Sequence, residues 1–228
     1  MSAKGIFRAA ALCVAIAGLT APLRADPLAC PGGQVLTEGA GADAPLICSL
    51  ADRVRAQLAS CNLIVPEPLT ISIVPALAEN CVGLYHCGEN RIDLLPPADY
   101  AERQAAGDLE AFQTISPEAI FESLMRHEMA HAALADTPCS HDSCLVTQEY
   151  VAYTMQIRFL PEGDRAAYTA EAPGPGTVSA DMLHPIILMM APDLFAHRAW
   201  RHLLDQDDPC GFIGRIVRGE ITLDIPQW

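Results

Sequence analysis

Lysine is nearly absent from this sequence of 228 residues, since Lys4 is the only one. Acidic residues outnumber lysine and arginine by 28 to 14, which gives a formal net charge of −14 at pH 7. A surface of this sign repels nucleic acids and anionic lipids, because both carry negative phosphates. The composition therefore argues against a nucleic-acid-binding protein, and it says little about any other substrate.

Long apolar runs are also missing. The apolar run over residues 9–19 is shorter than the ~20 residues that a transmembrane helix needs, and no other segment reaches that length. Lys4 and Arg8 come before this run, which is typical of a signal peptide. Residues 23–25, Leu-Arg-Ala, offer a cleavage site. We therefore predict a signal peptide over residues 1–25, with an uncleaved anchor as the alternative.

The remaining residues, 26–228, have a length that fits a single domain with its own core. Three of the 14 basic residues and none of the 28 acidic residues leave with the signal peptide, so the mature net charge is −17. Such a charge helps to keep an exported protein in solution. We expect a periplasmic or secreted protein without an integral membrane segment after cleavage.

No C-x₂-C pair is present, which argues against a zinc site built from cysteines. An even number of cysteines behind an export signal instead predicts disulfides in an oxidising compartment. Eight cysteines follow the predicted signal peptide: Cys30, Cys48, Cys61, Cys81, Cys87, Cys139, Cys144 and Cys210.

Two statements about the pairing follow from spacing. Cys139 and Cys144 flank a four-residue loop after Pro138, and this loop can bring them together. Cys48 and Cys61 bracket a predicted helix of about 18 Å, which is beyond the reach of a disulfide. We predict the first pair and exclude the second.

Apolar periodicity and turn residues predict the elements of an α+β domain with a small antiparallel or mixed sheet. An irregular lead-in occupies residues 27–46. It is followed by a helix capped by Ser49 (49–60), three strands (69–74, 81–86 and 91–95, the last two joined by a turn at 87–90), a helix from 117, a helix over 145–160, a loop over 162–178, helical residues 179–206 with a break near Pro192, and a mixed tail over 210–228.

The helix from residue 117 has clear start signals. Ser116 is the predicted N-cap, Pro117 suits the first turn, and Glu118 complements the helix dipole. Ile120 and Leu124 lie on the same face as two histidines further along, so the histidines continue an apolar stripe and face inward. Buried imidazoles need partners, and a metal ion supplies them.

These histidines belong to the motif His127-Glu128-Met129-Ala130-His131, an HExxH pentapeptide. Histidines at i and i+4 lie on one helix face, where both can ligate one Zn²⁺. Glu128 lies about 100° round the helix, too far to join them as a ligand but close enough to a water on the metal. This is the geometry of a zinc hydrolase, in which the carboxylate accepts a proton from that water.

A catalytic zinc needs a third protein ligand. Glu149 lies on the helix predicted over 145–160, and a helix packed antiparallel to the motif helix would point its carboxylate at the metal. His141 and Asp142, in the loop between Cys139 and Cys144, are the alternatives. The sequence by itself leaves these alternatives open.

The HExxH motif, followed after 17 residues by Glu149 and then by Tyr150-Val151-Ala152-Tyr153, resembles the small, single-domain gluzincin metallopeptidases. The predicted strands at 81–86 and 91–95 are similar to the sheet edge along which zincins bind an extended peptide. The resemblance covers roughly residues 69–160. It implies a zincin-like fold and one Zn²⁺ held by His127, His131 and Glu149.

The resemblance also implies an activity: hydrolysis of a peptide or protein substrate, with Glu128 as the general base. An endopeptidase and an aminopeptidase remain equally open. A second electrophile usually stabilises the oxyanion, and Tyr153, Tyr150 and His184 are the candidates. Two other classes stay in view. One is a zincin-fold module that binds zinc or a protein in the periplasm without catalysis, and the other is a disulfide-rich module in which HExxH occurs by chance.

Overall fold

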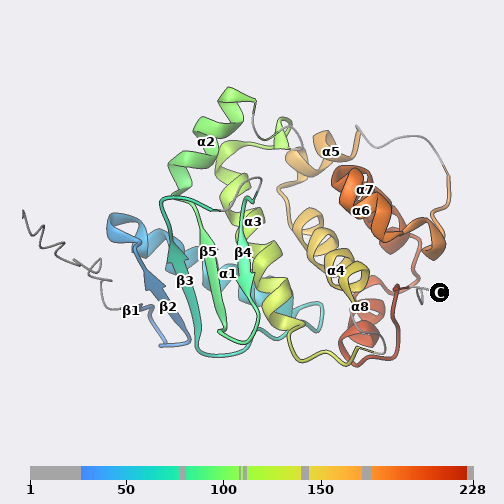
Figure 1. Cartoon of the computed structure of the whole chain (residues 1–228), viewed down its shortest axis with the longest axis horizontal. Helices are drawn as coiled ribbons and strands as arrows, with labels where there is room; N and C mark the ends of the chain where they lie inside the picture. The colour runs from blue at the N-terminus through green and yellow to red at the C-terminus, as the bar shows by residue number, and fades with distance from the viewer. Residues whose placement is uncertain are drawn as a thin grey trace, which may run out of the picture.

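The structure is a computed structural model that describes residues 27–77, 81–107, 109, 112–139, 144–170 and 176–224. The predicted signal peptide and the alternative ligands His141 and Asp142 lie outside the described residues. The described part has an α+β architecture, in which a small sheet and its helices lie on one side of α3 (Pro117–Ala133) and a group of helices lies on the other (Figure 1). No described helix has the length and apolar character needed to cross a membrane.

The sheet is mixed, with the strand order β1-β2-β3-β5-β4. Its strands are β1 (Leu28–Ala29), β2 (Val35–Glu38), β3 (Leu69–Ile73), β4 (Leu84–His86) and β5 (Arg91–Leu94). The three inner strands are parallel to one another, and the edge strands β1 and β4 run antiparallel to their neighbours. The prediction of a small antiparallel or mixed sheet is thus resolved as mixed, and β4 forms one of its edges.

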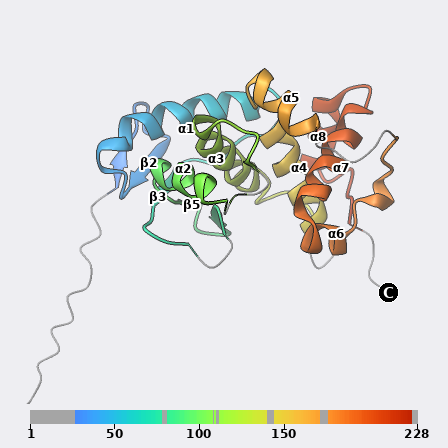
Figure 2. The same cartoon turned by 90° about the horizontal axis from the view of Figure 1, so that it is seen from above.

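One face of the sheet carries the core. Leu69, Ile71, Ile92 and Leu94 are fully buried, because side chains two residues apart on a strand point to the same face. The helices α1 (Ala44–Ala59) and α3 lie on one side of the sheet (Figure 2). Apolar side chains of both helices, such as Ile47 and Ile120, join the same core.

The C-terminal half is helical. It contains α4 (Leu145–Arg158), α5 (Glu162–Ala170), η3 (Ala180–Met182), α6 (Pro185–Met190), α7 (Pro192–Leu204) and α8 (Pro209–Val217). The helix α4 lies between α3 and α7 and packs against both (Figure 1). The helix that carries HExxH and the helix that carries Glu149 are therefore direct neighbours.

Three disulfides are present: Cys30–Cys48, Cys61–Cys210 and Cys139–Cys144. The predicted Cys139–Cys144 pair is confirmed, and Cys48 and Cys61 do not pair with each other. The expectation that all eight cysteines form disulfides is wrong, because Cys81 and Cys87 are free. These two flank the extended strand β4, which keeps its ends apart.

Several predicted boundaries differ from the structure. The first helix begins at Ala44 with Pro45 in its first turn, so Ser49 lies inside the helix and does not cap it. The lead-in predicted as irregular contains β2, a strand of only four residues, which pairs with β3 in parallel. A strand of four residues is stabilised mainly by pairing with a strand that is distant in sequence, so the pattern of neighbouring residues does not predict it.

Three further helices lie where none was predicted: α2 (Pro97–Ala106), α5 in the predicted loop, and α8 in the predicted tail. Each starts at or directly after a proline (Pro97, Pro161 or Pro209). Proline is suited to the first turn of a helix, where its missing N–H is not needed. Pro192 does mark the predicted break and begins α7.

Both helices of the site are capped by residues from elsewhere in the chain. Ser116 occupies the N-cap position of α3 as predicted, but its hydroxyl does not cap the helix. It donates instead to Asp164 Oδ2 (2.8 Å), while the Ser116 backbone N–H donates to Oδ1 (3.1 Å). At the start of α4, Asp224 accepts from the backbone N–H groups of Val146 (2.9 Å) and Thr147 (3.1 Å). Asp164 thus ties the start of α3 to α5, and Asp224 ties the start of α4 to the segment that follows α8.

Candidate metal centre

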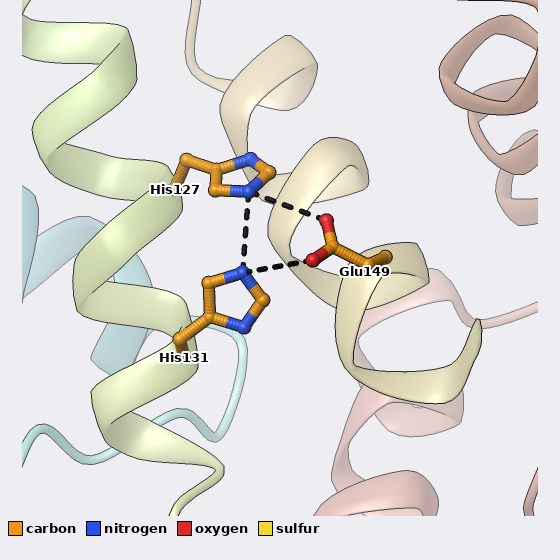
Figure 3. A group of neighbouring side chains, drawn as sticks. All are labelled: His127, His131 and Glu149. Carbon is orange, nitrogen blue, oxygen red and sulfur yellow. Dashed lines mark hydrogen bonds and ion pairs between the residues drawn. The ribbon is translucent and has the colours of Figure 1, made fainter. Parts of the chain in front are cut away.

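Two histidines on α3 form one side of the site. His127 and His131 are one helical turn apart, and their Nε2 atoms are 3.2 Å from each other. The side chains are 12% and 15% exposed, so both histidines face inward as predicted. Both rings also line a cleft. Both rings point from α3 toward α4 (Figure 3).

The third group comes from α4. The Glu149 carboxylate places Oε2 3.4 Å from His127 Nε2 and Oε1 3.5 Å from His131 Nε2. One ligand atom from each of the three residues lies within 4.8 Å of the others, so the group could hold a metal ion. The structure thus brings together the three residues predicted as ligands.

The chemistry of these atoms fits a cation. Carboxylate oxygens only accept hydrogen bonds, and a neutral imidazole nitrogen that carries no proton also only accepts. His127 uses its other nitrogen, Nδ1, in a 3.1 Å hydrogen bond with Gln156 Oε1. The two Nε2 atoms and the carboxylate of Glu149 therefore meet at one point, where a single positive ion satisfies all of them.

The charges of these groups are strongly coupled. Burial lowers the pKa of His127, but its hydrogen bond to Glu149 and the negative charge there outweigh burial, so the pKa is raised. Burial and the positive charge of His127 lower the pKa of His131 to about 4. Burial would raise the pKa of Glu149, but the two histidines lower it overall. The carboxylate of Glu149 is therefore ionised and the imidazole of His131 is neutral, which are the forms in which these two residues bind a metal ion.

Glu128 lies beside this group and not within it. The residue is only 6% exposed, and the backbone N–H of Tyr85 on β4 donates a hydrogen bond to its carboxylate. Burial and the charge of Glu149 raise its pKa, against the lowering effect of His127. Gly83 leaves room for this side chain, because a Cβ at Gly83 would lie 2.5 Å from Glu128 Oε1. The carboxylate is thus held between α3 and the edge of the sheet.

The site opens into a cleft of about 780 Å³ between β4 and the two helices. The segment around β4 forms one wall, with Cys81, Gly83, Leu84 and Cys87, and α4 contributes Gln148 and Tyr153 to the other. Asp136 adds a carboxylate beyond the end of α3. The cleft is therefore bounded on one side by β4, the edge strand of the described sheet.

Comparison with known proteins places the chain in a family. A family model described as "Family of unknown function (DUF6639)" matches residues 35–226. The chain belongs to this family. No curated protein and no solved structure matches it. The region that matches DUF6639 contains His127, Glu128, His131 and Glu149, so the whole candidate centre lies within the part that defines the family.

The three candidates for oxyanion stabilisation are separated by the fold of this DUF6639 member. Tyr153 lines the cleft, and its ring packs edge-on against His127 with centroids 4.7 Å apart. Tyr150 is fully buried and its hydroxyl is 2.9 Å from His202 Nδ1, in the core of the helical half. His184 Nδ1 accepts from Ile186 N (3.2 Å) at the start of α6. Of the three, Tyr153 is the one that reaches the cleft.

Sequence reasoning missed two residues that support the site. Gln156 follows Glu149 by seven residues, which is two turns of α4, so helical periodicity could have placed it on the same face. Gly83 carries no such signal, because its role depends on the approach of Glu128 from another element. A glycine in a short strand pattern could at most have suggested a close contact.

Proposed function

We propose that this chain is a zinc-dependent peptidase of the zincin type, exported to the periplasm or secreted. The observation that carries the proposal is the convergence of His127, His131 and Glu149, with Glu128 beside them against the edge strand β4. A chance HExxH on a helix surface would require neither a third ligand on a neighbouring helix nor a buried glutamate. The three disulfides agree with an oxidising compartment.

The spacing of the ligand atoms supports zinc as the metal. A tetrahedral zinc with bonds of about 2.0–2.1 Å has ligand atoms separated by about 3.4 Å. The Nε2 atoms of His127 and His131 are 3.2 Å apart, and each faces a different oxygen of Glu149, at 3.4 Å (Oε2) and 3.5 Å (Oε1), which is close to this spacing. Three protein ligands leave one position of a tetrahedron for water or substrate, as in catalytic zinc sites. When bound there, zinc polarises the carbonyl of a peptide bond and makes water a stronger nucleophile.

Glu128 is the proposed general base. Burial raises the pKa of Glu128, which makes its carboxylate a stronger proton acceptor than that of an exposed glutamate. The carboxylate takes a proton from the attacking water and delivers it to the nitrogen of the leaving amine, so hydrolysis consumes one water and leaves Glu128 unchanged. Gly83 and the N–H of Tyr85 hold the carboxylate in place for both transfers.

The edge strand β4 is the proposed binding site for the substrate backbone. An extended peptide can add to an exposed sheet edge through main-chain hydrogen bonds. Leu84 lies on this strand with 39% of its surface exposed and lines the cleft, so it can contact a substrate side chain. Across the cleft, Tyr153 is the proposed hydrogen-bond donor to the oxyanion, because burial raises the pKa of its hydroxyl and keeps it protonated.

The experiment is a comparison of metal content and hydrolysis in the mature protein and its Glu128→Gln variant. We expect about one zinc per chain in both, and cleavage of a mixed peptide library by the unsubstituted protein alone. The matched control is Glu162→Gln, which changes an exposed glutamate on α5 in the same chemical way. Zinc binding without any cleavage would favour the non-catalytic zinc-binding module, and a folded protein that binds no zinc would overturn the proposal.

A further inference from the structure

Behind the candidate metal centre lies a chain of buried hydrogen bonds that the proposed reaction does not use. It starts at the backbone carbonyl of Ile120 and passes through Ser123 and Gln156 to His127. Ser123 is fully buried and Gln156 is 4% exposed, so water does not compete for these contacts. This series of hydrogen bonds joins α3 to α4 and ends on the ring of His127, a proposed metal ligand.

The direction of these hydrogen bonds is set at the end farthest from the metal centre, at the carbonyl of Ile120. A backbone carbonyl cannot donate, so the Ser123 hydroxyl donates to Ile120 O over 2.8 Å. The hydroxyl oxygen then accepts from Gln156 Nε2 over 3.3 Å. This fixes the amide of Gln156 with its oxygen toward the histidine.

The histidine must therefore supply the last donor. Gln156 Oε1 lies 3.1 Å from His127 Nδ1, and an amide oxygen only accepts, so Nδ1 carries the proton. A neutral imidazole has one N–H, which leaves Nε2 with its lone pair directed at His131 and Glu149. Gln156 thus favours the tautomer that can bind a metal through Nε2, against Glu149, whose Oε2 lies 3.4 Å from Nε2 and favours a proton there.

We propose that Gln156, oriented by Ser123, is a positioning residue that holds His127 as its Nδ1–H tautomer for metal binding through Nε2. This inference rests on the proposed zinc site, but the tautomer itself is a property of the metal-free protein. The reversed amide would place the proton on Nε2, in the centre of the ligand group, and would remove the Ser123 donor from Ile120. Outer partners of this kind orient metal-bound histidines in general.

The variants separate hydrogen bonding from packing. Gln156→Leu removes the acceptor, and Gln156→Met does the same with a longer side chain should the leucine variant fail to fold. Gln156→Glu keeps an acceptor at the same place. The matched control is Thr154→Val, which removes a buried hydroxyl from the same helix that binds only the carbonyls of Tyr150 and Val151.

The primary measurement is the tautomer of His127 in metal-free, ¹⁵N-labelled mature protein, by long-range ¹H–¹⁵N correlation at mildly alkaline pH. His127→Gln assigns the signals. We expect the Nδ1–H form in the unsubstituted protein, Gln156→Glu and Thr154→Val, and a mixture or the Nε2–H form in Gln156→Leu. The Nε2–H form in the unsubstituted protein, or an unchanged Nδ1–H form in a folded Gln156→Leu variant, would overturn the inference.

A second measurement, competition with a chromophoric chelator, gives the zinc affinity of the same proteins. Loss of an outer hydrogen-bond partner typically weakens metal binding about 10- to 100-fold, which we expect for Gln156→Leu but not for Gln156→Glu or Thr154→Val. A protein with the Nδ1–H tautomer that binds no zinc would overturn the proposed function and support the positioning of His127. Zinc binding combined with an Nε2–H tautomer would overturn the positioning alone.

Discussion

The two halves of the molecule contribute to the site in different ways. The half that contains the sheet and α3 supplies His127, Glu128 and His131 within five consecutive residues. The helical half supplies Glu149, Tyr153 and Gln156 from successive turns of α4. Among the described residues, neither half by itself supplies all three members of the group His127, His131 and Glu149.

This difference shows what fixes the relative positions of the three proposed ligands. In the first half, the regular geometry of one helix fixes the two imidazoles relative to each other. In the second, the carboxylate reaches the metal position only if α4 lies at the correct distance and rotation against α3. That placement depends on contacts between the halves, such as the hydrogen bond from Gln156 on α4 to Ser123 on α3 and the Cys61–Cys210 disulfide.

The largest effect on function should come from removing one ligand from either half. His127→Gln and Glu149→Gln should each abolish stable zinc binding, because two remaining ligands cannot close a tetrahedral site. At zinc concentrations about 1,000 times the Kd, bound metal would add about 4.1 kcal/mol to the free energy of unfolding, and both variants should lose this increment. Thermal unfolding with and without a chelator measures it. Normal zinc binding by Glu149→Gln would transfer the third-ligand role to another residue, with His141 and Asp142 as the first to test.

The disulfide between the halves should matter more for stability than the one within a loop. Cys61 and Cys210 are 149 residues apart in sequence, whereas Cys139 and Cys144 are 5 apart. The chain-entropy model gives a loss of about 5 kcal/mol for the first pair and about 2 kcal/mol for the second. Denaturant unfolding of the two paired Cys→Ala variants compares them, and equal losses would contradict the role of the first pair as the link between halves.

Gly83→Ala should impair Glu128, the proposed base in the first half, without changing a metal ligand. The new methyl group would displace the Glu128 carboxylate, and a shift of about 1 Å in a catalytic group can cost about 100-fold in rate. Zinc content should stay normal. The control is Gly163→Ala on α5, where an added Cβ meets nothing within 4 Å. Full hydrolytic activity in Gly83→Ala would argue against Glu128 as the base.

Asp224→Ala should destabilise the start of α4 in the second half. It removes the acceptor for two backbone N–H groups at the start of α4, a change that typically costs about 1 kcal/mol. If the position of α4 decides the position of Glu149, zinc affinity should fall together with stability. Asp207→Ala, at an exposed acid in the same half, is the control. A stability loss with unchanged zinc affinity would separate the cap from the metal site.

The smallest effect concerns pH. Burial lowers the pKa of His202 below the ordinary value of 6.5, and its Nδ1 faces the Tyr150 hydroxyl. The unfolded chain then binds a proton more readily than the folded one, so stability contributed by His202 is lost as pH falls below about 6.5. The free energy of unfolding of His202→Gln, measured across this range, should fall less steeply than that of the unsubstituted protein. Identical slopes would show that His202 does not carry this dependence.

Much of the site was accessible to sequence reasoning because its signals are local. The HExxH spacing, Pro117 in the first turn of α3 and the apolar stripe each involve residues within a few turns of one helix. Glu149 was reachable from its motif, and the Cys139–Cys144 pair from its short loop. The helices that begin at Pro97 and Pro209 were missed because a proline by itself does not distinguish the end of one element from the start of the next.

The sequence by itself determined that two imidazoles and a glutamate share one helix, because α-helical geometry depends only on neighbouring residues. Only the tertiary structure decided which carboxylate completes the group, which tyrosine reaches the cleft, and which way the Gln156 amide points. These depend on how two helices from different halves pack. Contacts between the halves carry that packing, such as Gln156 with Ser123 and Ser116 with Asp164, whose partners lie far apart in the chain.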